Sequence, residues 1–292
     1  MNVSKSVNDA ELQMSSPEID SLVKTIVIPP RPKTLVDLQA EMRQEDPNFG
    51  RVAGMISTDV ALTVAVLRIV NSPAYGLRRQ CESVEQAVSI LGLKQLNVIV
   101  TGLVLRKVLR TDGPQLTRFW DVSGKRSHSM QRLARSLGGV DVDLAQSFGL
   151  FCDVGIPLLM HRFPDYGRTL GACNEEPKLS FTEVEQSKHQ TDHALLGALM
   201  ARSWGLSKDL CLAIRLHHDY AVFQDRQVPE TIARLIAMGL VAELAIQRFA
   251  NLNRSTEWEK GGDQAIGVLM LNEQDLEDRI EQLIEDFGIG LA

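Results

Sequence analysis

The residues best suited to chemistry are histidines, four of which lie within residues 189–220 although the chain of 292 residues contains only six. His217 follows three apolar residues at the spacing of one helical face, and His193 shares a face with apolar residues downstream. Both imidazoles are therefore predicted to point inward. Two imidazoles that converge with a carboxylate suit iron, manganese or zinc. Buried histidines are also commonly hydrogen-bonded core residues, so both interpretations stay open here.

Two short helices must carry these histidines. Ser207 is a suitable N-cap for the helix that leads to His217, and Thr191 or Asp192 can cap the helix that begins near His193. His218 lies about 100° further around the same helix, near a C-terminus that favours a protonated ring. Apolar residues recur at helical spacing along the chain, and no segment has a clear strand pattern. The sequence therefore predicts an all-α fold.

Composition limits the classes of partner. The net charge of −6 opposes nonspecific nucleic-acid binding, and no long Lys/Arg cluster overrides it. The four cysteines are widely spaced, which predicts neither a disulfide framework nor a zinc finger. No run of about 20 uninterrupted apolar residues and no secretory h-region is present, so we expect a cytoplasmic protein without a membrane partner.

Proline and glycine signals predict how the chain is divided. Residues 1–24 are polar and are predicted to form a mobile tail or a weak first helix. An N-terminal helical lobe is expected over 25–112, up to the break at Asp112-Gly113-Pro114. A second helical lobe is expected over 113–225. Residues 226–292 are predicted to form a helical extension that packs on this core.

Several motifs resemble one family of bacterial signalling domains. They include the segment ISTDVALTVAVLRIVNSPAYG that ends at Gly76, the segment SVEQAVSILGLKQL that starts at Ser83, and Cys152-Asp153-Val154-Gly155 in the place of a His-Asp pair. In these motifs the chain is similar to HDOD domain proteins over roughly residues 25–222. The resemblance implies an HD-like helical fold, with 25–225 as the HDOD domain.

The same resemblance implies where a metal site would lie. Catalytic HD phosphohydrolases hold one or two metal ions with a histidine on an early helix, an adjacent His-Asp pair and a later aspartate. Here these positions fall near Val122, at Cys152 and Asp153, and near Leu240, so only Asp153 retains a ligand. Asp153 is interpreted as a metal ligand, as a helix cap near Gly155, or as the partner of an inward histidine. Cys152 is either a soft ligand or a small buried hydrophobe.

The functional hypotheses follow from this loss of metal ligands. The predicted remnant pocket consists of Val122, Cys152, Asp153, His193, His217 and His218, with Asp153, His193 and His217 as the ligands of any divalent iron, manganese or zinc ion. The sequence favours a noncatalytic signal-transduction module that contacts signalling proteins in trans, with no assigned catalytic residue. The alternative is a residual metal-dependent phosphohydrolase, similar to a phosphodiesterase, that uses Asp153, His193 and His217. An apolar stripe on the final helix, including Leu276 and Ile280, also leaves a homodimer open.

Overall fold

A computed structural model describes residues 7–15, 26–109, 114–252 and 256–289. All regular structure in these residues is helical, which confirms the predicted all-α class. The chain forms two compact units, one of residues 29–110 and 286–292 and one of residues 1–28 and 111–285. The predicted lobe boundary at 112–114 falls mostly within residues 110–113, which lie outside the described residues.

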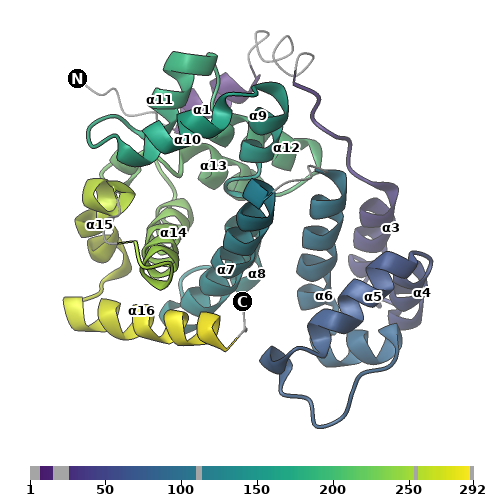
Figure 1. The fold of residues 1–292 in the computed structure, drawn as a ribbon. Helices are drawn as coiled ribbons and strands as arrows, with labels where there is room; N and C mark the ends of the chain where they lie inside the picture. The colour runs from purple at the N-terminus through teal and green to yellow at the C-terminus, as the bar shows by residue number, and fades with distance from the viewer. Residues whose placement is uncertain (1–6, 16–25, 110–113, 253–255, 290–292) are drawn as a thin grey trace. The chain divides into compact units, whose positions relative to one another are not determined.

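The unit of residues 29–110 is built from helices with clear start and stop signals (Figure 1). These elements are α3 (Lys33–Met42), α4 (Phe49–Ser57), α5 (Val60–Val70), the 3-10 turn η1 (Pro73–Tyr75) and α6 (Val84–Val108). The Ser83 side chain caps α6 by accepting a hydrogen bond from the Gln86 amide. Gly92 adopts φ 71° and ψ 163°, so α6 consists of two helical segments joined at a kink.

The other unit contains the candidate site. Its elements are α1 (Val7–Ser15), α7 (Pro114–Leu137), α8 (Val142–Phe151), α9 (Gly155–Arg162), α10 (Tyr166–Glu175), α11 (Phe181–His189), α12 (His193–Ser203), α13 (Lys208–Leu216), the 3-10 turn η2 (Tyr220–Phe223), α14 (Glu230–Phe249), α15 (Thr256–Leu269) and most of α16 (Glu273–Gly288). Helix α7 packs against α8 and α14, and α12 packs against α13. Side chains of Ser180, Asp192 and Ser207 cap α11, α12 and α13.

Two parts of this unit bear on the sequence predictions for tails and loops. Residues 7–15, expected within a mobile tail, form α1 with Ala10 and Met14 buried, so the alternative of a first helix is correct for this stretch. Residues 1–6 and 16–25 of the predicted tail lie outside the described residues. The polar composition of residues 167–180 and 251–263 favours connecting loops, but in the structure these stretches contain most of α10 and the start of α15. Residues 226–285 of the predicted extension belong to the same compact unit as α7–α13.

Within the part of the chain that the structure describes, two helical stretches, Val84–Val108 and Val142–Arg162, are long and apolar enough to cross a membrane. The strongly bent pair α4–α5 would add a third if it counted as one span. Length and composition therefore do not exclude a membrane span, contrary to the expectation from the sequence. The Gly92 kink interrupts the first stretch, and the turn that carries Asp153 interrupts the second.

Gly155 allows the backbones of α9 and α12 to meet. A Cβ atom at this position would lie 2.0 Å from the His193 carbonyl oxygen. We predict that Gly155→Ala lowers the free energy of unfolding by about 2 to 3 kcal/mol, because the helices that carry the site must separate. Urea denaturation measures this loss. Gly171→Ala is the matched control, since a Cβ there meets no atom within 4 Å; equal effects of the two substitutions would contradict the prediction.

Candidate functional site

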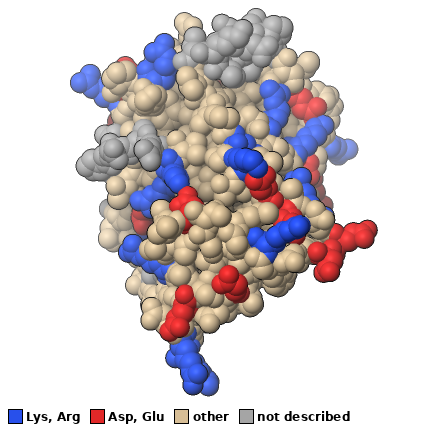
Figure 2. Space-filling view, turned by 90° about the vertical axis from the view of Figure 1, so that its right-hand side faces the viewer, with Lys and Arg blue, Asp and Glu red and all other residues tan. Residues whose placement is uncertain are grey.

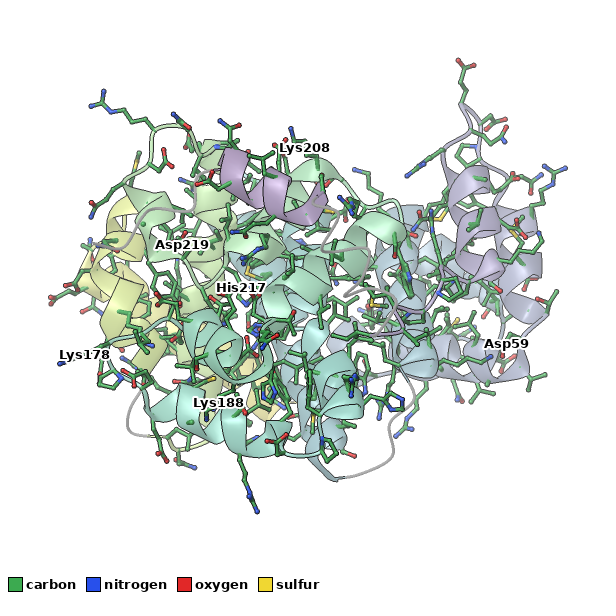
Figure 3. The ribbon with its side chains drawn as sticks, turned by 90° about the horizontal axis from the view of Figure 1, so that it is seen from above. Asp59, Lys178, Lys188, Lys208, His217 and Asp219 are labelled. Atoms are coloured by element: carbon green, nitrogen blue, oxygen red, sulfur yellow. The ribbon has the colours of Figure 1, made fainter. Side chains whose placement is uncertain are left out.

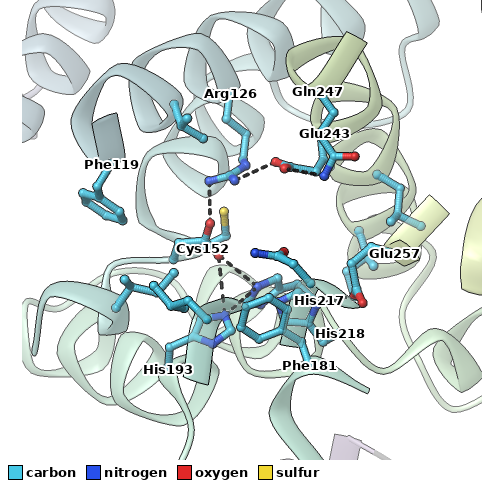
Figure 4. Close-up of a pocket in the computed structure, with 18 of the residues that line it drawn as sticks. Phe119, Arg126, Cys152, Phe181, His193, His217, His218, Glu243, Gln247 and Glu257 are labelled. Carbon is cyan, nitrogen blue, oxygen red and sulfur yellow. Dashed lines mark hydrogen bonds and ion pairs between the residues drawn. The ribbon is translucent and has the colours of Figure 1, made fainter. Parts of the chain in front are cut away.

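A cavity of about 400 Å³ lies inside the second unit, among α7, α9, α10, the ends of α12 and α13, α14 and α15 (Figure 4). All six residues of the predicted remnant pocket line it, namely Val122, Cys152, Asp153, His193, His217 and His218. Aromatic and aliphatic side chains form much of the remaining wall, including Phe119 and Phe181. The cavity thus brings together residues that are up to 96 positions apart in the chain.

Two histidines and one carboxylate converge at the floor of the cavity. The Nε2 atoms of His193 and His217 lie 3.2 Å apart. The Asp153 Oδ1 atom lies 3.5 Å from His193 Nε2 and 3.2 Å from His217 Nε2. Helix α12 supplies His193 from its first turn, and His217 is the C-cap of α13. Both rings therefore point inward, as their helical positions predicted.

The opposite nitrogen of each histidine ring has a fixed acceptor. His193 Nδ1 lies 2.7 Å from Glu185 Oε2, His217 Nδ1 lies 2.7 Å from the Ile214 carbonyl oxygen, and His218 Nδ1 lies 2.7 Å from Glu257 Oε2. A carbonyl or carboxylate oxygen accepts, so each Nδ1 must carry the hydrogen. Each Nε2 is then left for another partner, which is the usual arrangement in a histidine that ligates a metal.

These histidines and Asp153 could hold one metal ion. One ligand atom each from Asp153, His193, His217 and His218 can be chosen so that all four lie within 4.8 Å of one another. Three imidazoles and one carboxylate match the donor preferences of zinc, iron or manganese. His218, a predicted residue of the pocket, therefore adds a fourth donor to the predicted ligand set of Asp153, His193 and His217.

Without a metal ion, a proton can occupy the space between the two Nε2 atoms. Burial disfavours a charged His193, but Glu185 and Asp153 outweigh this effect and raise the pKa of His193 to about 10. Burial and the neighbouring rings of His218 and His193 lower the pKa of His217 to about 4. His193 is therefore the charged donor of this pair, and His217 is the neutral acceptor. The buried Tyr166 hydroxyl supports the arrangement by donating to Glu185.

A buried arginine occupies the other side of Asp153. Arg126 Nη1 lies 2.8 Å from Asp153 Oδ2, and Arg126 Nη2 lies 2.8 Å from Glu243 Oε2. The guanidinium side chain is only 9% exposed. Although burial favours the neutral carboxyl group, Arg126 and the two histidines hold the pKa of Asp153 well below its usual range. Asp153 is thus an ion-pair partner, and not the cap of the helix near Gly155.

Arg126 and Glu243 lie near the positions where the early histidine and the later aspartate of an HD site were expected. Arg126 lies one helical turn after Val122 on α7, and Glu243 lies one turn after Leu240 on α14. Neither was predicted, because no local pattern distinguishes a buried Arg or Glu from an exposed one. The clue available in the sequence was their i+4 and i+3 spacing from positions at which ligands had been lost.

Cys152 is not an available thiolate. It is buried, and burial raises the pKa of its thiol to about 12 despite the nearby Arg126. Its side chain therefore acts as a small hydrophobe, which was one of the two sequence interpretations. His189 lies outside the cluster, with its Nε2 2.8 Å from Thr169 Oγ1 and its ring packed on Phe163.

The C-terminal extension contributes an unpredicted carboxylate. Glu257 of α15 accepts hydrogen bonds from His218, from the Tyr220 hydroxyl at 2.5 Å and from Lys260 at 2.8 Å. Burial opposes ionisation of Glu257, but His218 and these donors lower its pKa strongly. Helix α15 therefore helps to orient a histidine of the site.

Comparison with known proteins identifies relatives of the chain. The family model described as HDOD domain matches residues 28–220. A relative from Treponema pallidum, an uncharacterised protein, is 24% identical over 222 residues, which are 75% of this chain and 42% of the relative. A second relative, the uncharacterised protein YuxH of Bacillus subtilis, is 26% identical over 43% of this chain and 30% of its own. The chain thus spans less than half the length of these curated relatives.

Solved structures show the same fold. An HDOD domain protein from Geobacter sulfurreducens has a TM-score of 0.71 at 20% identity, with 96% of each chain covered. A protein from Marinobacter aquaeolei VT8, provisionally named a signal transduction protein, has a TM-score of 0.75 at 20% identity and covers 99% of this chain and 66% of its own. A protein from Shewanella amazonensis SB2B, provisionally named a phosphohydrolase, has a TM-score of 0.70 at 22% identity over 95% of this chain and 97% of its own. At these identities the likeness establishes the fold alone.

Proposed function

The chain belongs to the HDOD domain family, and from this premise we propose that it is a noncatalytic regulatory module on a degenerate HD scaffold. Its expected partners are signalling proteins in trans, in a bacterial cytoplasm, and a homodimer is compatible with this role. The solved relative provisionally named a signal transduction protein supports the class of function. The chain covers less than half of each curated relative, so any activity of a whole relative would be only a proposal for this chain.

One observation carries the noncatalytic proposal. Arg126 forms ion pairs with Asp153 and Glu243, while Val122, Cys152 and Leu240 offer no ligand at the positions where HD enzymes hold a metal ion. The Arg126 guanidinium, whose side chain is 9% exposed, places a permanent positive charge beside Asp153. Asp153 is the carboxylate that a first metal ion would need as a ligand. Binding a metal ion there would bring two cations together at one carboxylate, which is unfavourable in a buried site.

Surface charge supports a protein partner over a nucleic acid. On the face shown in Figure 2, basic and acidic side chains are interspersed, and the coloured residues form no extended basic patch. The net charge is −6. A nucleic-acid interface normally concentrates positive charge on one face.

A residual metal-dependent phosphohydrolase is the second candidate. The observation in its favour is the donor set of Asp153, His193, His217 and His218, whose ring Nδ1 atoms already have acceptors. A metal ion held by these residues would supply a water of lowered pKa for attack on phosphorus. In either case the chain's own contribution is to hold the Nε2 atoms of His193 and His217 beside the Asp153 carboxylate and to keep Arg126 on its other side.

Metal content and hydrolysis separate the two candidates. We expect untagged protein incubated with manganese, iron or zinc to retain no more than one ion per chain by elemental mass spectrometry. If one ion is retained, His217→Ala should weaken its retention by about tenfold or more, because the substitution removes a ligand. His189→Ala is the control, since this ring lies outside the donor set. Phosphodiester and phosphomonoester substrates should show no turnover above the metal ion alone.

Other results favour the phosphohydrolase. Two retained ions per chain would mean that Arg126 does not block the first site. Metal-dependent hydrolysis that is abolished in Asp153→Ala would replace the noncatalytic proposal with the enzymatic one.

A further inference from the structure

The short helix α1 covers the outer side of the two helices that carry the histidines. It packs on α12 and α13, although about 180 residues separate it from them in the chain. Ala10 and Met14 are its buried contacts, while Leu12 is 68% exposed. Figure 3 shows Lys208 beside α1, and Lys208 Nζ lies 2.7 Å from Glu11 Oε1.

A buried polar pair connects α1 to the site. Arg215 Nη2 donates to Gln13 Oε1 at 2.7 Å, and Arg215 Nη1 lies 3.7 Å from Asp192 Oδ1. The side chains of Arg215 and Asp192 are 2% and 0% exposed. Asp192 caps α12 directly before His193, and Arg215 lies two residues before His217. Gln13 therefore touches the charge pair that holds the ends of both histidine-bearing helices.

The contacts of α1 are few for a permanent part of the core. A nine-residue helix is not stable alone in water, so α1 depends on its docking for its structure. Its buried face consists of one small and one flexible apolar residue, and the Glu11–Lys208 pair is partly solvated, at 37% and 69% exposure. Among the described residues the buried Arg215 Nε atom has no hydrogen-bond partner, so the bond that Arg215 Nη2 makes to Gln13 is important for satisfying this guanidinium.

We propose that α1 is a reversibly docked helix, and that its release, or its replacement by a partner helix of similar chemistry, changes the histidine site through Arg215 and Asp192. Such a partner helix is short and amphipathic, with a small residue and a methionine on its buried face and an acceptor side chain opposite Arg215. Release of α1 exposes the buried Arg215–Asp192 pair to water. The N-terminus of α12 and the C-terminus of α13, which carry these residues, then change conformation. The coupling between α1 and the histidine site rests on the proposed regulatory function. The docking of α1 does not depend on that function.

The test uses the full-length chain with one substitution on each face of α1. Met14→Asp places a charge in the buried contact and is expected to release the helix, whereas Leu12→Asp places the same charge on the exposed face and should not. Amide hydrogen exchange of residues 7–15 measures release. A synthetic peptide of residues 1–15 should bind Met14→Asp at least about tenfold more tightly than wild type, in which α1 competes for the groove.

The second readout is the state of the site. Nitrogen-15 NMR of the imidazole rings should show shifted His193 and His217 signals in Met14→Asp, partly restored by the peptide, and wild-type signals in Leu12→Asp. Gln13→Ala, which removes only the hydrogen bond to Arg215, should shift the same signals while the rest of the protein stays folded. Peptide binding without any ring shift would overturn the coupling but not the docking. Protection of α1 in Met14→Asp, or equal effects of the two aspartates, would overturn the docking itself. Neither result depends on whether the module is catalytic.

Discussion

Replacing Arg126 with methionine is expected to lower the free energy of unfolding by about 3 to 5 kcal/mol near pH 8. The substitution leaves Asp153 and Glu243 without the guanidinium that lies 2.8 Å from each. Methionine keeps a long, flexible side chain in the same space, so the loss reports the missing charge more than a new cavity. Denaturation in guanidinium chloride, followed by circular dichroism, measures the change.

The pH dependence of this loss has a definite sign. In the wild type, Arg126 and the histidines hold the pKa of Asp153 well below its usual value of about 4. The stabilisation from this carboxylate is therefore present above about pH 4 and is lost as the pH falls through the folded-state pKa. In Arg126→Met the folded-state pKa of Asp153 rises, so protonation relieves the buried charge at a higher pH. The difference between variant and wild type should thus narrow from pH 8 toward pH 5.

Arg248 provides the matched control. It also contacts a carboxylate with both terminal nitrogens, but Arg248 and its partner Glu277 are 39% and 46% exposed. Arg248→Met is expected to change the free energy of unfolding by about 1 kcal/mol or less. If Arg126→Met cost no more than Arg248→Met, Arg126 would not be the buried cation on which the noncatalytic proposal depends.

Local signals explain what the sequence predicted correctly. Ser207 and Asp192, both predicted as N-caps, accept from amides within three residues of themselves, so their roles follow from the sequence alone. The inward direction of His193 and His217 is also local, because helical spacing places each ring among apolar neighbours. The convergence of the two rings on Asp153 was predicted from these two helical faces and from the family motif Cys152-Asp153-Val154-Gly155.

Long-range pairing explains what the sequence did not reveal. Glu243 is 117 residues from Arg126, and Glu257 is 39 residues from His218. No helical period distinguishes such buried carboxylates from the exposed ones that surround them in the chain. The same limit applies to Gln13, which contacts Arg215 across 202 residues. These long-range partners of the site residues could therefore be identified only from the three-dimensional structure.

Helix α15 shows how a local signal can mislead. The polar stretch of residues 251–263 favours a loop, and the Gly261-Gly262 pair within it also disfavours a helix. In the structure both glycines are helical, and a Cβ atom at either would lie within 3 Å of a ring, that of Tyr220 or that of Trp258. The glycines are there for close packing against aromatic rings. Tyr220 in turn donates to Glu257, so this packing also positions the support of His218.

The second large effect is expected at Glu185. Its carboxylate lies 2.7 Å from His193 Nδ1, and both side chains are fully buried. In chelator-treated protein, Glu185 and Asp153 raise the pKa of His193 from about 6.5 to about 10. A group whose pKa is raised on folding stabilises the fold fully below its unfolded-state pKa, and this stabilisation is lost as the pH rises through the folded-state pKa. The free energy of unfolding should therefore decline between about pH 7 and pH 10.

Glu185→Gln keeps a hydrogen-bond acceptor for His193 but removes the charge that stabilises the imidazolium. We expect a loss of about 3 kcal/mol at pH 6, where wild-type His193 is charged, and a smaller loss near pH 10, where the wild type has itself lost part of this stabilisation. The decline with pH should also be weaker in the variant. Glu281→Gln, at an exposed position of α16, is the control and should follow the wild-type curve. Parallel curves for Glu185→Gln and wild type would mean that His193 does not hold the proton between the two rings. In that case both rings would be neutral in chelator-treated protein, and their two Nε2 lone pairs would face each other across 3.2 Å. Such a repulsive arrangement would favour a metal ion between the rings in the untreated protein.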